Sequence, residues 1–84
     1  QKRAKQAALK VFPNPSTDVV SIQSVLGNEI ITRYEVFDVS GKSMMCENVY
    51  ASQKNISLQS LSAGVYTMKI SFQTGHETFK VVKN

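Results

Sequence analysis

Cysteine, histidine and tryptophan are scarce in this sequence of 84 residues, which has one cysteine, one histidine and no tryptophan. A single cysteine, Cys46, can form no disulfide within the chain and cannot supply the several thiolates of a zinc site. It follows Met44 and Met45, so we expect a half-buried thiol on a strand, without a role. No apolar run approaches the ~20 residues that cross a bilayer, and no N-terminal secretory signal is visible.

The residue types that carry catalysis are present but form no constellation. His76 follows Gly75, where we expect a polar hairpin turn, and its neighbour Glu77 would point to the opposite face of a strand. The six acidic residues are scattered singly, without the spacing of a glycosidase or metal site. Asp38 precedes Ser40-Gly41, so its side chain is expected to cap the amides of a turn. The sequence therefore predicts a protein that is not an enzyme, with no cofactor, metal site or small-molecule substrate.

Basic charge is confined to the start of the chain. The net charge is +4, yet four of the ten basic residues stand within the first ten positions, and from residue 11 onward six basic residues balance six acidic ones. Nucleic-acid binders usually carry their basic excess on the folded face, so nucleic acid is not an expected partner. Residues 1–10 are too short for an isolated helix and are expected to be a basic flexible linker. Residues 11–84 form the single domain.

Apolar residues alternate with polar ones at the end of the chain. Tyr66, Met68, Ile70 and Phe72 fall on every second position, which is typical of a strand with one buried face. A second alternating run over 78–83 follows Thr74-Gly75. The two runs predict a terminal β-hairpin.

The other segments indicate further short strands. The run 30–39 has apolar residues on both parities, so we expect a central strand buried on both faces. Runs at 19–24, 43–50 and 56–61 also read as strands, and Pro13 with Pro15 marks an edge or a strand end. About seven short strands without a helical period predict an all-β, antiparallel β-sandwich.

Four segments together resemble one protein family. They are VFPNPSTDVVSI (11–22), YEVFDVSGKSM (34–44), LQSLSAGVYTMKI (58–70) and GHETFKVVKN (75–84). In order, spacing and terminal position, they resemble the C-terminal sorting domain of cargo proteins of the type IX secretion system (Por secretion system) of Bacteroidetes. The resemblance implies an immunoglobulin-like β-sandwich, although the Cys…Trp…Cys pattern of antibody domains is absent.

The resemblance also implies a targeting function. The cargo would cross the periplasm and be recognised by the outer-membrane shuttle and translocon proteins of the type IX system. A surface sortase, a cysteine transpeptidase, would then cut before the domain and join the cargo to lipopolysaccharide, which leaves the cargo at the outer membrane and cell surface or secreted. The positions that match the family motifs are Pro13, Asn14, Pro15, Asp38, Gly41, Lys42, Leu61, Gly64, Tyr66, Lys80 and Lys83.

Two other functions are considered from the sequence. A carbohydrate-binding or adhesive sandwich is disfavoured, because the chain has no tryptophan and its acidic residues are dispersed; a retained surface interaction or signalling domain remains open. We expect the terminal hairpin to hold Lys80 and Lys83 outward and to offer its edge strand to a partner. The same edge would permit weak homo-oligomers. Deletion of 79–84 is then predicted to leave the cargo in the periplasm.

Overall fold

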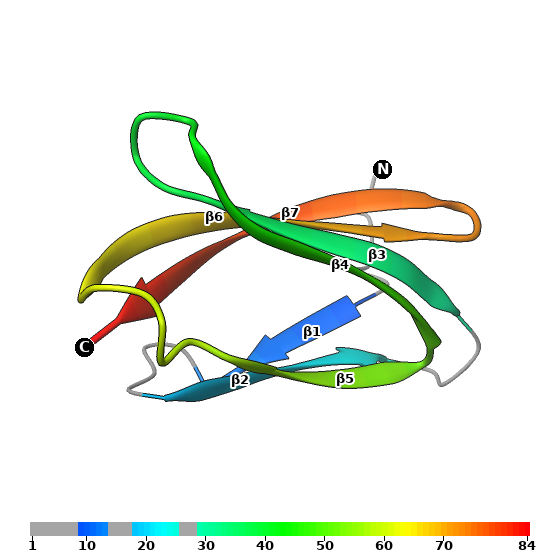
Figure 1. Cartoon of the computed structure of the whole chain (residues 1–84). Coiled ribbons are helices and arrows are strands. Elements are labelled where there is room, and N and C mark those ends of the chain that lie inside the picture. Colours follow the sequence, from blue (N-terminus) through cyan, green and yellow to red (C-terminus); the bar gives the residue numbers. More distant parts are fainter. Residues whose placement is uncertain (1–8, 14–17, 26–28) are drawn as a thin grey trace, which may run out of the picture.

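The computed structural model describes residues 9–13, 18–25 and 29–84, and these residues form two antiparallel β-sheets. A three-stranded sheet has the order β1-β2-β5, and a four-stranded sheet has the order β4-β3-β6-β7. The two sheets face each other as the layers of a sandwich (Figure 1), which confirms the predicted all-β class. The described residues contain no helix that could cross a bilayer. The strands are β1 (Leu9–Phe12), β2 (Val19–Ser24), β3 (Ile31–Phe37), β4 (Ser43–Ala51), β5 (Gln53–Ser57), β6 (Gly64–Phe72) and β7 (Gly75–Lys83).

The terminal hairpin forms as its alternating sequence predicts. The register of β6 and β7 runs without a break from Gly64↔Lys83 to Phe72↔Gly75. The inward face of β6 is buried, whereas the residues between the buried positions are largely exposed. The turn itself is Gln73-Thr74, so Gly75 already belongs to β7. His76, expected in the turn, is an exposed residue of β7.

Strand β3 is central, as predicted, because it pairs with β4 on one side and β6 on the other. The expectation that it is buried on both faces is wrong. Tyr34 and Val36 point into the sandwich and are buried, whereas Arg33 on the opposite face is exposed. Val39, in the turn after the strand, is 86% exposed. The described residues cover only one face of this sheet, so apolar residues of the other parity remain toward solvent.

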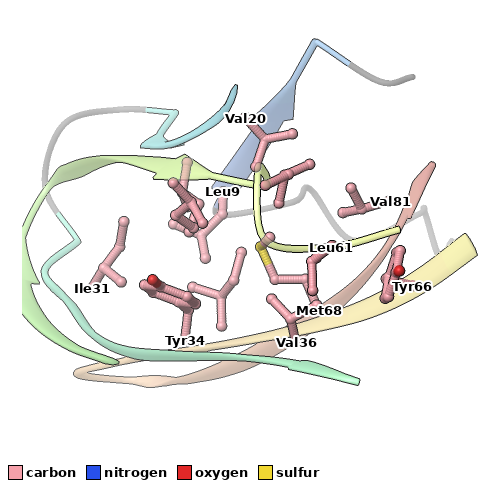
Figure 2. Packing of buried hydrophobic residues seen from close by; sticks show 13 residues of the cluster. Leu9, Val20, Ile31, Tyr34, Val36, Leu61, Tyr66, Met68 and Val81 are labelled. Carbon is pink, nitrogen blue, oxygen red and sulfur yellow. The ribbon is translucent and has the colours of Figure 1, made fainter. Parts of the chain in front are cut away.

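The core lies between the two sheets and takes side chains from both (Figure 2). In the part of the chain that the structure describes, Ser24 of β2 is the one buried polar residue, and its hydroxyl accepts a hydrogen bond from the Glu29 amide at 3.1 Å. Among the described residues, no buried side-chain nitrogen or oxygen lacks a hydrogen-bond partner. The apolar core residues are Leu9, Val20, Ile22, Ile31, Tyr34, Val36, Ile56, Leu58, Leu61, Tyr66, Met68, Ile70 and Val81.

The domain begins earlier than expected. Leu9 is 2% exposed and belongs to the core, and its amide donates to Glu77 Oε1 at 3.1 Å. Leu9 and Lys10 both lie in β1, so the boundary between linker and domain at residue 11 was placed too late. Residues 1–8 lie outside the described residues.

On each lateral side of the sandwich, one carboxylate contacts a residue of the opposite sheet. On the β4–β5 side, Glu47 Oε2 lies 3.5 Å from Lys54 Nζ. On the β1–β7 side, Glu77 accepts the hydrogen bond from Leu9. Each contact joins one sheet to the other, so two isolated acids of the sequence act as links between the layers.

Candidate functional site

The strand order brings residues of several family motifs to one end of the sandwich. The turn 38–42 between β3 and β4, the start of β6 at Gly64 and the end of β7 at Lys83 lie at the same end, because neighbouring strands run antiparallel. Figure 1 shows this end on the left, with the C-terminus, whereas the start of β1 and the β6–β7 turn lie on the right. We call the left side the motif end. Pro13 follows β1 at this end, and Asn14 and Pro15 lie outside the described residues.

The turn at the motif end is organised around Asp38. Its Oδ1 accepts hydrogen bonds from the Ser40 amide at 2.9 Å, the Ser40 hydroxyl at 2.7 Å and the Lys42 amide at 3.0 Å. The hydroxyl of Ser40, followed by the amide of Lys42, lowers the pKa of the Asp38 carboxyl below its usual value. Gly41 has φ +89°, a conformation that L side chains rarely adopt. The predicted capping role of Asp38 is confirmed, and the turn holds Lys42 exposed.

A second group at the motif end fixes the segment 58–63, which connects the two sheets. The Tyr66 hydroxyl donates to the Ser62 carbonyl at 2.6 Å. The Lys83 ammonium donates to the Leu61 carbonyl, also at 2.6 Å, and the Leu61 side chain is buried in the core. We call Leu61, Tyr66 and Lys83 the crossover clamp, because they fix the path of the chain from β5 to β6.

The clamp corrects the expectation that Lys83 points outward. Lys83 shares its parity with Val81, which is 1% exposed, so it lies on the inner side of β7. Its ammonium reaches a backbone carbonyl of the connecting segment. Lys80, on the other parity, is exposed as predicted.

The family-motif residues therefore divide into two groups. Leu61, Tyr66 and Lys83 shape the motif end from inside, and Asp38 holds its turn. Gly64 begins β6 with φ +158°, nearly extended. The exposed members are Pro13, which marks a strand end as predicted, and Gly41, Lys42 and Lys80. These exposed positions are the ones that a partner can reach.

Strand β7 is an edge strand of the four-stranded sheet, as predicted. Lys80 and Val82 take part in further interactions, and β1 approaches the start of β7 through the contact between Leu9 and Glu77.

Each of the six carboxylates has a structural partner. Tyr34 illustrates the effect: its hydroxyl donates to Glu47 Oε1 at 2.8 Å, and burial followed by this hydrogen bond raises the pKa of Tyr34 to about 12. Within the described ranges, no three His, Cys, Asp or Glu side chains are arranged to hold a metal ion. The pairs are Asp18 with Gln59, Glu29 with Thr74, Glu35 with Arg33, Asp38 with the amides of its turn, Glu47 with Tyr34 and Lys54, and Glu77 with the Leu9 amide.

Cys46 is not half-buried, as the sequence indicated, but exposed on the outer face of β4. It lies opposite Glu35 of β3, on the same face. Its parity differs from that of Met45, which packs against the core. The apolar neighbours Met44 and Met45 led to the expectation that Cys46 is half-buried, but a shift of one residue along a strand moves a side chain to the opposite face.

Apolar residues are exposed at the motif end of the four-stranded sheet, and two of them, Phe37 and Val39, belong to the run that was expected to be buried on both faces. At the motif end, Val39 is 86%, Val65 42% and Met44 40% exposed. Phe37 is half-buried, and its register partners are Thr67, two residues from Val65, and Ser43, next to Met44. The sequence offered one indication that Val39 is exposed: it stands between Asp38 and Ser40-Gly41, in a predicted turn, and turns usually lie at the surface.

Comparison with protein-family models matches residues 10–84 to the model described as secretion system C-terminal sorting domain. The match covers β2 to β7 in full and begins within β1. No curated protein matches the chain.

Proposed function

We infer the function of this chain from its family: it belongs to the secretion system C-terminal sorting domains, matched over residues 10–84. It is therefore a C-terminal sorting signal of type IX secretion, and such a signal implies export across the outer membrane to the cell surface or the medium. The observation that carries this conclusion is the match over residues 10–84, which includes β2 to β7 and most of β1. The steps of the route are proposals of our own.

We propose that the cargo, joined upstream of Leu9, is presented away from the motif end. The chain enters the domain at the start of β1, opposite the turn 38–42 and the C-terminus (Figure 1). A cargo at that end leaves Lys42 and Lys80 accessible to the outer-membrane shuttle and translocon proteins during periplasmic transit in a bacterium of the Bacteroidetes. In this proposal the domain acts by recognition alone and is not an enzyme, a role that the structural pairing of its carboxylates supports.

Fusion to a reporter tests the targeting function. Residues 1–84 are joined to a periplasmic reporter with a general export signal, and the reporter is expressed in a bacterium that has the type IX machinery. We expect the reporter at the surface, where an external protease degrades it, and in the periplasm of a strain that lacks the translocon. The matched control carries Val36→Asp, which places a charge in the core and abolishes folding. A reporter with the intact domain that stays in the periplasm would contradict the function.

Cleavage by a surface sortase is the finer proposal. Because Leu9 is part of the core, a cut that leaves the domain folded falls before it. Mass spectrometry of the mature reporter should then show a new C-terminus upstream of Leu9, bearing lipopolysaccharide. An intact domain on the displayed reporter would instead identify a retained surface module.

A further inference from the structure

The outer face of the four-stranded sheet is polar across its middle and apolar at the motif end. Across the middle of this face the register places charged and polar residues side by side. At the motif end the side chains become apolar: Phe37, Val39, Met44 and Val65, which we call the apolar patch. The polar rows are Asn48–Arg33–Ser71–His76 and Cys46–Glu35–Lys69–Thr78.

The most exposed residue of the patch contributes little to the fold. Val39 lies in the turn stabilised by Asp38 and is almost fully exposed, so it contributes little to the core. The turn projects from the sheet at the motif end (Figure 1). Apolar side chains grouped on a protein surface mark interaction sites more often than isolated ones do.

Positive charge flanks the patch. Lys42 is exposed on the turn, and Lys80 is exposed in the row that contains Phe37 and Thr67. The carboxylate nearest to Lys42 in sequence, Asp38, accepts hydrogen bonds from the amides of the turn, whereas Lys80 takes part in a further interaction and keeps its exposed charge. Glu35 Oε1 lies 3.6 Å from Arg33 Nη2, in an ion pair. A complementary surface therefore presents an apolar centre with carboxylates at its margin.

We infer that the apolar patch, with Lys42 and Lys80 at its margin, is the docking surface for a protein partner that presents apolar side chains ringed by carboxylates. The inference rests on the proposed function and specifies the surface through which the machinery recognises the domain. The cargo is not the occupant, because the chain enters at the opposite end (Figure 1).

Two other occupants fit less well. In a symmetric pair of copies the lysines of both margins approach each other, and like charges disfavour such a contact. For an anionic lipid surface, two lysines and four apolar side chains give less attraction than stable attachment requires.

The test uses two variant pairs and matched controls in the reporter fusion. The patch variant is Val39→Glu with Val65→Glu, and its control is Val25→Glu, a valine that is 45% exposed outside the patch. The margin variant is Lys42→Gln with Lys80→Gln, and its control is Lys69→Gln on the polar part of the same face. We expect each variant pair to reduce surface display about tenfold or more, and each control to retain display within about twofold of the wild type. Circular dichroism and cooperative unfolding confirm that each purified domain is folded.

A binding measurement keeps the surface testable apart from export. The purified domain is incubated in one sample with outer membranes isolated from the same bacterium and in another with phosphatidylglycerol–phosphatidylcholine vesicles. Its oligomeric state is measured separately by sedimentation velocity of the domain alone. We expect binding to the outer membranes that is lost after protease treatment of the membranes and weakened about tenfold in both variant pairs.

The outcomes separate the two proposals. If the wild-type reporter is displayed and the folded variants are displayed equally, the docking surface is refuted and the sorting function stands. If the wild-type reporter is not displayed, the sorting function is refuted, and the binding measurement alone decides on the patch. Equal binding to the lipid vesicles, or a dimer that the patch variant dissociates, overturns the protein partner in favour of a membrane or a second copy.

Discussion

Lys83→Met tests the crossover clamp, because it removes the ammonium and retains most of the side-chain stem. Lys83 Nζ lies 2.6 Å from the Leu61 carbonyl. A hydrogen bond from a charged donor contributes about 1.5–3 kcal/mol, and water competes for a half-buried lysine. We therefore expect a loss near the lower limit, about 1.5–2 kcal/mol of unfolding free energy.

The assay is urea unfolding of the purified domain, followed by circular dichroism, with a thermal melt beside it. At about 4–8 °C per kcal/mol for a domain of this size, the expected fall in Tm is roughly 6–16 °C. The control is Lys69→Met, an exposed lysine of β6, for which a change below about 0.5 kcal/mol is expected.

A double-mutant cycle locates the effect in the clamp. Tyr66→Phe removes the hydroxyl that donates to the Ser62 carbonyl and should cost about 0.5–1.5 kcal/mol. Because both bonds hold the same connecting segment, the losses of Lys83→Met and Tyr66→Phe should be non-additive by about 0.5 kcal/mol or more. Equal stability of the Lys83→Met and Lys69→Met domains would refute the clamp, and additive losses would show that the two bonds act separately.

Three further predictions concern the core and two titrating groups. Leu9→Ala should lower the unfolding free energy by about 2–5 kcal/mol in urea unfolding, whereas Lys10→Ala should change it little; equal small effects would return Leu9 to the linker. The pKa of Tyr34 is raised to about 12, so its contribution to stability is complete below pH ~10 and is lost as the pH rises from there through 12; the ultraviolet titration of the Tyr34 phenol, identified by its loss in Tyr34→Phe, should move to lower pH in Glu47→Gln. The pKa of Asp38 is lowered, so its contribution is present above about pH 4 and is lost as the pH falls through the lowered value; the difference in Tm between the wild type and Asp38→Ala should shrink in acid, and a difference that does not depend on pH would contradict a role for the charge.

Alternation in the sequence was sufficient to predict the terminal hairpin, because only one parity of β6 is apolar throughout its length. The run 30–39 has apolar residues on both parities, so the sequence alone could not decide that Ile31, Tyr34 and Val36 are buried in the core while Val39 is exposed. That decision depends on what covers the sheet. The described residues place the second sheet on one side only.

The orientation of Lys83 and the start of the first strand could both have been predicted from the alternation of the sequence. Lys83 follows Val81 by two residues, so the period of a strand already places it on the inner side. Leu9 and Val11 flank Lys10 in the same alternation, which extends the first strand by two residues. Because lysine is charged, Lys83 was expected to point outward and Lys10 was assigned to the basic linker. A lysine stem can nevertheless lie along apolar surface while its ammonium reaches a polar group.

The clamp also determines which experiments can identify the recognition residues. Deletion of 79–84 removes Val81 from the core and Lys83 from the clamp, so the cargo is expected to remain in the periplasm because the domain no longer folds, whatever the partner contacts. Substitution of Lys42, which is exposed on a turn that Asp38 stabilises, changes the surface without removing any core contact. A variant that unfolds like the wild type and is not exported therefore identifies recognition, whereas a truncation identifies only the requirement for a folded sandwich.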